Sequence, residues 1–349
     1  MADIETGQLT SETRDRAGRQ GHSVSPEVLV ATELLKPCQS LPLVIRPSFE
    51  SVDAAAWAES NRDFIEARLL RHGALLFRNF NLNSVEAFER FIGAISGELL
   101  EYRERSSPRS QVSAKIYTST DYPANQSIFL HNENSYQRTF PLKLFFYCSI
   151  PAQQGGETPI ADCRKIYQRI DPQVRERFMQ KKWMYVRNFG DGFGLPWQTV
   201  FQTTDRARVE EQCRPKGIHV EWKDDHRLRI STVLPAVARH PRTGELSWFN
   251  HATFFHVSTL EPSMREVLLE EFRETDLPTN TFYGDGSTIE PFVLDELREI
   301  YRQEMISFSW QQGDVMMLDN LLTAHGRAPY VGARKILVGM AEPIAREEV

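Results

Sequence analysis

The sequence predicts a mainly β, α+β fold, and three features of the 349-residue chain support it. Aromatic residues make up 11% of the chain, a composition that favours strands and a β-rich interior. Short apolar runs bounded by turn residues recur over residues 183–256, as in strands of a sheet. Amphipathic helical segments flank them on both sides. Large β domains with insertions reach this length, so we expect one domain over residues 28–349 with an inserted segment at about 165–300.

The chain up to residue 100 predicts a helix, a strand and a second helix. Residues 54–71 carry apolar side chains at helical spacing, and Gly73 ends this helix. Residues 74–78 (ALLFR) then predict a buried strand. Ser84 is a favourable N-cap for the second helix, which is expected to continue to Ile95.

The centre of the chain predicts two strands separated by a polar loop. Residues 127–130 form a short apolar run that leads directly into His131, and residues 142–150 (LKLFFYCSI) predict a core strand. The intervening residues are polar and turn-like. His131 therefore stands where a strand opens into a loop, a position at which binding residues often lie.

The second half of the chain predicts both helices and strands. Asp171 and Pro172 are typical of a helix start, because Pro is favoured in the first helical turn. The predicted helices cover residues 172–182, 262–275 and 291–305, and the predicted strands lie within 183–256 and at 314–319 and 334–340.

Composition excludes several classes of protein. The net charge is −6 and no basic block occurs, which argues against a nucleic-acid-binding protein. Residues 1–27 are polar, contain no signal-peptide-like apolar stretch and are expected to form a disordered tail, and no run is long enough for a membrane span. The four Cys are far apart and form no CxxC, as expected for reduced thiols in a cytoplasmic protein.

A His-x-acid motif is a candidate for two metal ligands, and the chain contains two of them. With nine His and 47 acids in 349 residues, chance alone gives 9 × 47/349, roughly one match. His219 and Glu221 lie in a charged stretch that resembles a surface hairpin. His131 and Glu133 follow an apolar strand, and Thr158 follows 25 residues later beside two glycines. The sequence context therefore favours the pair formed by His131 and Glu133.

A third ligand can come from His240, His251, His256 or His325. His240 opens a turn, whereas His251 and His256 stand among aromatic residues and are expected to be packed side chains. His325 follows a predicted strand and precedes Arg334 by nine positions. Two His and one carboxylate, with other coordination positions open, suit Fe(II). The same set also binds zinc, so a zinc hydrolase remains an alternative at this stage.

Five sequence pieces follow one another along the chain, namely HNENSY, GGETPIAD, FYGDGS, WQQGDVMMLDN and AHGRAPYVGARK. Together they resemble the taurine dioxygenase and clavaminate-synthase-like superfamily of Fe(II)/2-oxoglutarate oxygenases. The resemblance covers roughly Ala74 to Glu342 and looks strongest for the branch of amino-acid hydroxylases that includes the syringomycin aspartyl hydroxylase.

The resemblance implies a double-stranded β-helix (jelly-roll, cupin-like) core with flanking helices. It implies that the iron ligands are His131, Glu133 and His325, and that Thr158 and Arg334 bind the distal carboxylate of 2-oxoglutarate. Arg334 lies nearer to the distal His than in many members. Lys335 and Arg327 are therefore further candidates for this carboxylate.

The resemblance also implies the reaction. With Fe(II) as its metal, the enzyme would consume 2-oxoglutarate and O2. It would oxidise an amino acid or amino-acid-derived metabolite, free or tethered to a carrier protein, as in secondary metabolism. Succinate and CO2 would be released. Hydroxylation is the expected outcome, with desaturation or cyclisation as alternatives, and Glu133 argues against halogenation because related halogenases lack the acidic ligand. A non-catalytic cupin-like small-molecule binding protein is the alternative from another class.

Substrate contacts are expected on the loop after His131, where Asn134, Ser135 and Tyr136 can face the open iron positions. Arg109 and Arg138 are cations that can hold a substrate carboxylate, although each also fits a structural or solvated role. Residues 188–200 are rich in Gly and aromatic residues, which fits either a mobile lid or a plain surface loop.

Overall fold

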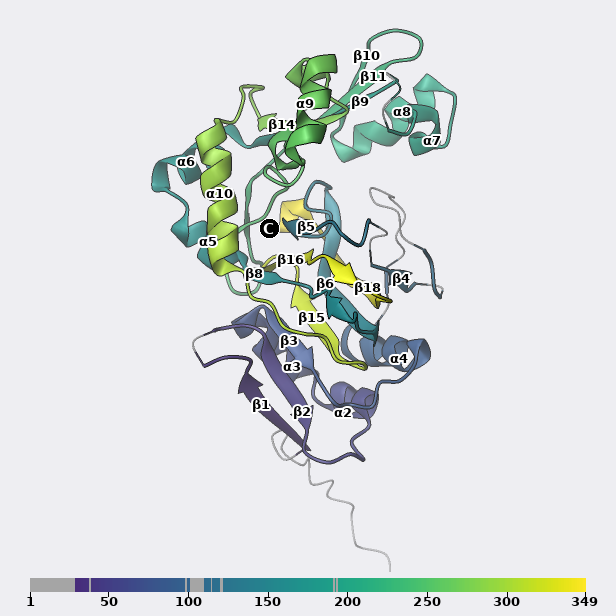
Figure 1. Ribbon diagram of the computed structural model, residues 1–349, viewed down its shortest axis with the longest axis vertical. Helices are drawn as coiled ribbons and strands as arrows, with labels where there is room; N and C mark the ends of the chain where they lie inside the picture. Colours follow the sequence, from purple (N-terminus) through teal and green to yellow (C-terminus); the bar gives the residue numbers. More distant parts are fainter. Residues whose placement is uncertain are drawn as a thin grey trace, which may run out of the picture.

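The computed structural model contains a mixed seven-stranded sheet as its largest element (Figure 1). Neighbouring strands are antiparallel except for β2 and β3, which run parallel. In sheet order the strands are β1 (Val30–Leu34), β2 (Leu43–Pro47), β3 (Ala74–Phe77), β15 (Val315–Asp319), β6 (Thr139–Ile150), β18 (Lys335–Ala345) and β4 (Tyr117–Thr118). The structure describes residues 29–37, 39–97, 99–100, 110–113, 115–119, 122–190, 192 and 194–349, so the predicted tail over residues 1–27 lies outside it.

Smaller sheets complete the β structure of the described residues. A three-stranded sheet contains β5 (Ile128–His131), β16 (Thr323–Arg327) and β8 (Ile160–Asp162). A four-stranded sheet contains β10 (His219–Trp222), β11 (Leu228–Leu234), β9 (Trp183–Phe189) and β14 (Thr279–Tyr283). Two-stranded pairs are formed by β12 (Val237–Arg239) with β13 (Leu246–Trp248), and by β17 (Tyr330–Val331) with β7 (Gln154–Gly155).

The helices lie around these sheets, and none in the described residues is long and apolar enough to cross a membrane. Their bounds are α2 (Ala54–Ser60), α3 (Arg62–His72), α4 (Val85–Ser96), α5 (Cys163–Arg169), α6 (Pro172–Lys181), α7 (Trp197–Phe201), α8 (Arg206–Cys213), α9 (Pro262–Glu271) and α10 (Pro291–Glu304). Ser84 caps α4 and Asp171 caps α6, which confirms both predicted helix starts.

The predicted helix over residues 54–71 was wrong in one respect, because the structure divides it into α2 and α3 at Asn61. The Asn61 side chain donates to the main-chain oxygen of Trp57 at 2.7 Å, and its backbone N–H bonds to Ala58. A side chain that competes for helix carbonyls in this way stops the helical pattern locally. Gly73 ends α3 in the left-handed conformation, as predicted.

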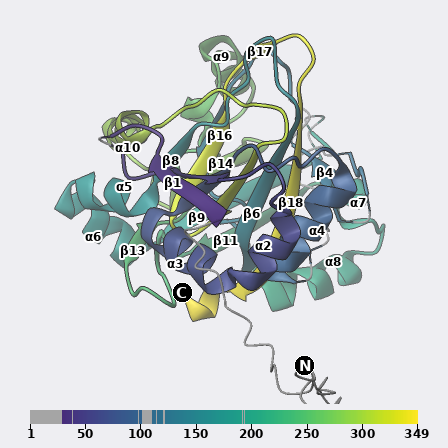
Figure 2. The same cartoon turned by 90° about the horizontal axis from the view of Figure 1, so that it is seen from below.

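Each face of the seven-stranded sheet is covered differently. Helices α2, α3 and α4 pack on one face, where Trp57, Phe77 and Phe91 belong to one core cluster (Figure 2). Side chains alternate along β6, so that Phe145 joins this cluster whereas Phe146 faces the opposite side with Ile160 of the three-stranded sheet. The space between these two sheets is therefore the place where residues from β5, β8 and β16 meet the large sheet.

The segment between α6 and β14 contains strands, as predicted, and also two unexpected short helices. Trp197 of α7 and Val209 and Cys213 of α8 pack with Phe189 of β9 in a separate cluster. These helices have only five and eight residues, too few to produce a clear helical period in the sequence. In Figure 1 the four-stranded sheet and α7, α8 and α9 lie at the opposite end of the molecule from β1 and β2.

Candidate active site

Strand pairing brings two imidazoles together. His131 ends β5 and His325 lies in the middle of β16, and these two residues are direct cross-strand partners. Their ring centroids are 4.5 Å apart. His325 follows the predicted strand that ends at Asp319, as expected, and the structure places it inside a further buried strand that the sequence did not predict. Register between β5 and β16 is the physical cause of this proximity.

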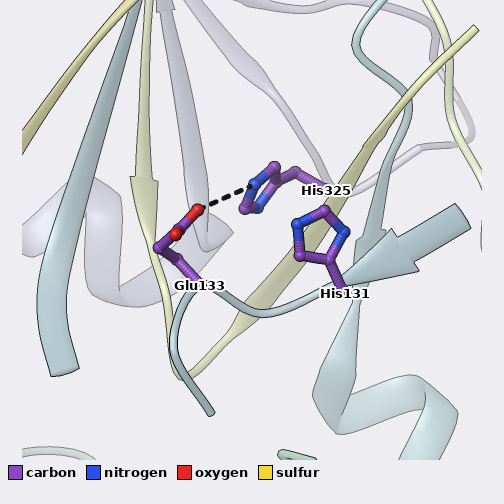
Figure 3. A group of neighbouring side chains, drawn as sticks. All are labelled: His131, Glu133 and His325. Carbon is purple, nitrogen blue, oxygen red and sulfur yellow. Dashed lines mark ion pairs between the residues drawn. The ribbon is translucent and has the colours of Figure 1, made fainter. Parts of the chain in front are cut away.

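Glu133 completes a group of three candidate metal ligands. One ligand atom from each of Glu133, His131 and His325 lies within 4.8 Å of the others, and Oε2 of Glu133 is 3.8 Å from Nε2 of His325 (Figure 3). Glu133 and His325 are only 4% and 5% exposed. A carboxylate and two imidazoles so close together and so well buried form a donor set that suits Fe(II).

The main chain of Glu133 is fixed by the side chain of Asn320. The Glu133 N–H donates to Oδ1 of Asn320 at 2.8 Å, and Nδ2 of Asn320 donates to the Glu133 carbonyl at 2.9 Å. The same Nδ2 also donates to Pro141 at the start of β6, and Nδ2 of Asn132 donates to the Asn320 carbonyl. The loop that carries the carboxylate is thereby tied to the end of β15 and to β6.

The tautomer of His131 follows from its own hydrogen bond. Nδ1 of His131 lies 2.9 Å from the carbonyl oxygen of Phe129, so Nδ1 carries the proton and donates. Nε2 then carries the lone pair that a metal ligand requires. A main-chain carbonyl in this role is the usual orienting partner of a metal-binding imidazole.

A second part of the site lies around Arg334, just before β18. Its Nε donates to the Gly156 carbonyl at 2.8 Å, one terminal nitrogen donates to Ser119 at 3.3 Å, and the other donates to Thr158 at 3.4 Å. Within the described residues, these partners are all uncharged oxygens. Burial lowers the pKa of Arg334 to about 10, and the side chain remains charged at neutral pH. Such a buried cation is suited to a carboxylate from outside the chain.

Thr158 is oriented by two donors. Its Oγ1 accepts from Nε1 of Trp310 at 3.1 Å and from Arg334. A hydroxyl has two acceptor lone pairs and one O–H, so the remaining capacity of Thr158 is as a donor. A cavity of about 30 Å³ is lined by Thr158, Arg334, His131 and His325, so the basic end and the candidate metal ligands share one space.

The two other candidates for the carboxylate have different environments. Arg327 donates to the main-chain oxygens of Tyr122, Pro123 and Gln126, which ties down that segment. Its side chain also lines the small cavity. Lys335 is exposed and lines an outer cavity of about 290 Å³. Arg334 is the cation whose donors converge with Thr158.

The loop after Glu133 places the predicted substrate residues beside the histidines. Oγ of Ser135 lies 2.5 Å from Nδ1 of His251, and Tyr136 packs edge-on against His251 with ring centroids 5.1 Å apart. Asn134 has a positive φ of 56° and accepts from the Tyr136 hydroxyl. Ser135 and Tyr136 therefore belong to the cluster next to His131.

Other sequence candidates lie elsewhere. Arg138 is 47% exposed, pairs with Glu347 and donates to Pro215, so the structure does not bring it to the histidines. Arg109 lies outside the described residues. The second His-x-acid pair, at His219 and Glu221, lies on β10 of a hairpin with β11, as predicted.

Several neighbours of the site were not found from the sequence as functional residues. His251 was expected to be a packed residue, and it is buried, but its ring lies 5.6 Å from that of His131. Burial, followed by electrostatic interactions with His131 and Arg346, holds the pKa of His251 well below its usual range. Phe254 packs at 4.6 Å against His131, and Phe146 at 5.0 Å against His325. No local motif marks these residues, because they reach the site through tertiary packing.

Comparison with known proteins agrees with this geometry. The family described as "Taurine catabolism dioxygenase TauD, TfdA family" matches residues 36–341. The dapdiamide synthesis protein DdaC of Enterobacter agglomerans is 39% identical over 280 residues, which cover 80% of this chain and 85% of that protein. The clavaminate synthase-like protein At3g21360 of Arabidopsis thaliana is 27% identical over 319 residues, covering 86% and 93%.

Solved structures share the fold. PvcB of Pseudomonas aeruginosa superposes with a TM-score of 0.55 at 16% identity, covering 96% of this chain and 94% of that one. A second PvcB structure, titled as an Fe, alpha-ketoglutarate dependent oxygenase from an isonitrile synthetic pathway, gives 0.54 at the same identity and coverage. The chain thus belongs to the TauD, TfdA family, and it is a dioxygenase that depends on Fe(II), 2-oxoglutarate and O2.

Proposed function

We propose that His131, Glu133 and His325 bind the iron and that this centre hydroxylates an amino acid or an amino-acid-derived metabolite. The convergence of the three ligand atoms within 4.8 Å is the observation that carries the proposal. The donor set fits Fe(II) because two imidazoles and one carboxylate would hold the ion and would leave coordination positions open for the co-substrates.

We infer that 2-oxoglutarate binds at the end of the cavity that contains Arg334 and Thr158. Arg334 offers a planar fork that matches a carboxylate, and the hydroxyl of Thr158 is oriented to donate. We assign the distal carboxylate of 2-oxoglutarate to these two residues. Arg327 contributes charge from the cavity wall, and Lys335 contributes from outside it. When bound, Fe(II) with 2-oxoglutarate and O2 supplies the oxidising power, and succinate and CO2 are the products.

The surrounding residues determine where a substrate can lie. The rings of His251 and Phe254 pack against His131, and Tyr136 and Phe255 pack against each other and against His251. We infer that this cluster faces the substrate, together with Asn134 and Ser135. Its aromatic and neutral character suits a substrate with an apolar or amide portion.

The relatives support a metabolite as the substrate. DdaC is named for dapdiamide synthesis and PvcB for an isonitrile synthetic pathway, and both are natural-product roles. We propose a comparable biosynthetic substrate here, free or tethered to a carrier protein and met in the cytoplasm. Desaturation and cyclisation use the same centre and remain the alternative outcomes.

We further propose that the two facing sheets form the double-stranded β-helix of a single oxygenase domain. The large sheet and the sheet of β5, β16 and β8 face each other across the cluster that contains Phe146 and Ile160. Residues 165–300 would then be an insertion, since they carry the separate four-stranded sheet between β8 and β15. Among the described residues of 188–200, Trp197 is buried, and we propose that this segment forms a lid over the site.

Succinate formation tests the proposed function. The enzyme is incubated with Fe(II), 2-oxoglutarate and O2 in the presence of a panel of amino acids and their amides, and succinate and modified substrate are quantified by mass spectrometry. The proposal predicts Fe(II)-dependent succinate that His131→Ala abolishes, together with a mass gain of one oxygen in a panel member. A zinc hydrolase with the same ligands would be unaffected by 2-oxoglutarate, and Fe(II)-independent succinate would contradict the proposal.

A further inference from the structure

Arg346, close to the C-terminal end of the chain, is a buried cation beside the loop that begins at Glu133. The side chain is 6% exposed and lies beyond residues 36–341, which match the family. Its guanidinium donates to three main-chain carbonyls, those of Ser135, Gln137 and Pro235. Its backbone N–H donates to the carbonyl of Arg138 at 2.7 Å. The C-terminal segment is therefore bonded to the loop that begins at Glu133.

The environment of Arg346 holds it in one place. Its guanidinium carbon lies 5.5 Å from the ring centroid of Phe140 and 5.2 Å from that of Phe249. Within the described part of the chain, the partners that the guanidinium has are carbonyls and aromatic faces rather than a carboxylate. A buried charge is tolerated only where such groups offset its loss of water. Removing the donors leaves the carbonyl of the buried Ser135 without the hydrogen bond from Arg346.

The loop that Arg346 holds carries Glu133, and it reaches His131 through His251. Glu133 lies two positions before Ser135, and Asn134 between them adopts a left-handed conformation, which costs free energy for a residue other than glycine. Ser135 uses its side chain to bond His251, whose ring packs edge-on against His131. The hydrogen bond from Arg346 to the Ser135 carbonyl thus acts on the backbone two residues after Glu133, at the residue whose side chain bonds His251.

We propose that Arg346 is a positioning residue for the iron centre, which fixes the Glu133 loop through the Ser135 carbonyl and the His131 ring through Ser135 and His251. This inference rests on the proposed ligand roles of His131 and Glu133. Groups that orient metal ligands from behind typically change metal affinity by roughly 10–100-fold when they are removed. Arg346 would act in this way although it touches neither the metal nor the substrate.

Metal affinity provides a readout that does not depend on turnover. Mn(II), a redox-stable probe for a His and carboxylate site, is titrated anaerobically into the full-length protein and the unbound ion is followed by electron paramagnetic resonance. Arg346→Met keeps an apolar chain between the two rings but has no donors, and we expect a Kd about 10–100-fold higher than in the wild type. Arg346→Lys retains the charge and one donor group, so we expect an intermediate Kd. Arg239→Met is the matched control, because Arg239 is an exposed arginine that also donates to a main-chain carbonyl.

Each outcome decides between a positioning and a merely structural role. Circular dichroism establishes the folded fraction, and a Mn(II) Kd within twofold of the wild type in folded Arg346→Met would overturn the inference, even with a lower Tm. If Arg346→Met does not fold, Arg346→Lys and Ser135→Ala decide, and wild-type affinity in both overturns it. A wild-type protein that binds no Mn(II) would instead contradict the proposed ligand set, which separates the two failures.

Discussion

The side-chain amide of Asn320 bonds both the N–H and the C=O of Glu133, although the two residues are 187 positions apart in the sequence. One amide thus fixes the peptide groups on both sides of the proposed acidic ligand. Asn320 is fully buried at the end of β15, so its own position is set by the core of the large sheet. The side chain of Asn320 therefore links the backbone of Glu133 to the large sheet.

Replacing Asn320 by Ala should weaken both metal binding and folding. The variant leaves the Glu133 and Pro141 main-chain groups without partners, so we expect about a 10–100-fold higher Fe(II) Kd and a loss of roughly 1–3 kcal/mol in the free energy of unfolding. Asn188→Ala is the control, since Asn188 also donates to two carbonyls but lies on β9. Equal Fe(II) affinities in the two variants would contradict this role of Asn320.

Arg334→Met should raise the KM for 2-oxoglutarate. The variant loses the planar fork but retains a similar stem, so we expect a KM increase of at least tenfold, corresponding to about 1.4 kcal/mol or more of binding free energy, with a smaller change in kcat. Lys335→Met tests the competing assignment. If the exposed Lys335 held the carboxylate, its variant would show the larger increase, and the assignment to Arg334 would be wrong.

Gly156→Ala should displace the side chain of Arg334. Gly156 has a φ of +74°, and an added Cβ would lie 2.9 Å from Cδ and 3.1 Å from Nε of Arg334. Arg334 must shift, so we expect a raised KM for 2-oxoglutarate in addition to lower stability. Gly244→Ala is matched for backbone strain, with a φ of +72° and nothing within 4 Å of its added Cβ. A KM that rises equally in both variants would show that strain, rather than contact with Arg334, is the cause.

His256 should make the fold less stable as the pH falls. Burial, followed by the charge of Arg298, lowers the pKa of His256 to about 4, whereas the unfolded chain has the ordinary value near 6.5. Between these two values the unfolded state binds the proton and the folded state does not, so stability decreases from pH 6.5 towards pH 4. The shift corresponds to roughly 3 kcal/mol as an upper limit.

The variant His256→Asn separates this effect from other titrations. Nδ1 of His256 accepts from the Ser258 N–H at the start of a 3-10 turn, and Asn can provide the same cap without titrating. Urea denaturation at pH 7 and pH 4.5 should show a smaller stability loss in the variant than in the wild type. The same loss in both proteins would exclude His256 as a cause.

The features that could be predicted from the sequence are local ones. The strand ending at His131, the caps at Ser84 and Asp171, and the hairpin around Glu221 all depend on nearby residues, and the structure contains each of them. The motif around His325 was recognised, yet its position inside β16 was not, because strand β16 is defined by partners β5 and β8 rather than by its own short sequence.

The features that could not be predicted depend on contacts between distant segments. Asn320 stands within a recognised motif, but its bonds to Glu133 require β15 and the loop to meet. Arg346 lies outside every motif, and its contacts with the Ser135 carbonyl and with Phe140 and Phe249 arise only from tertiary packing. The sequence offered Arg138 as a cation for a substrate carboxylate, but its half-exposed side chain pairs with Glu347 and donates to the Pro215 carbonyl.

Anaerobic absorption spectroscopy tests the central assignment most directly. Fe(II) and 2-oxoglutarate are added to the wild type and to the variants His131→Ala, Glu133→Ala and His325→Ala, and the weak visible charge-transfer band of the Fe(II) complex with 2-oxoglutarate is recorded. We predict a saturable band in the wild type that is lost or strongly weakened in all three variants. The control His219→Ala, which alters the other His-x-acid pair, should keep the full band. A normal band in any ligand variant, or its loss in His219→Ala, would contradict the assignment of iron to His131, Glu133 and His325.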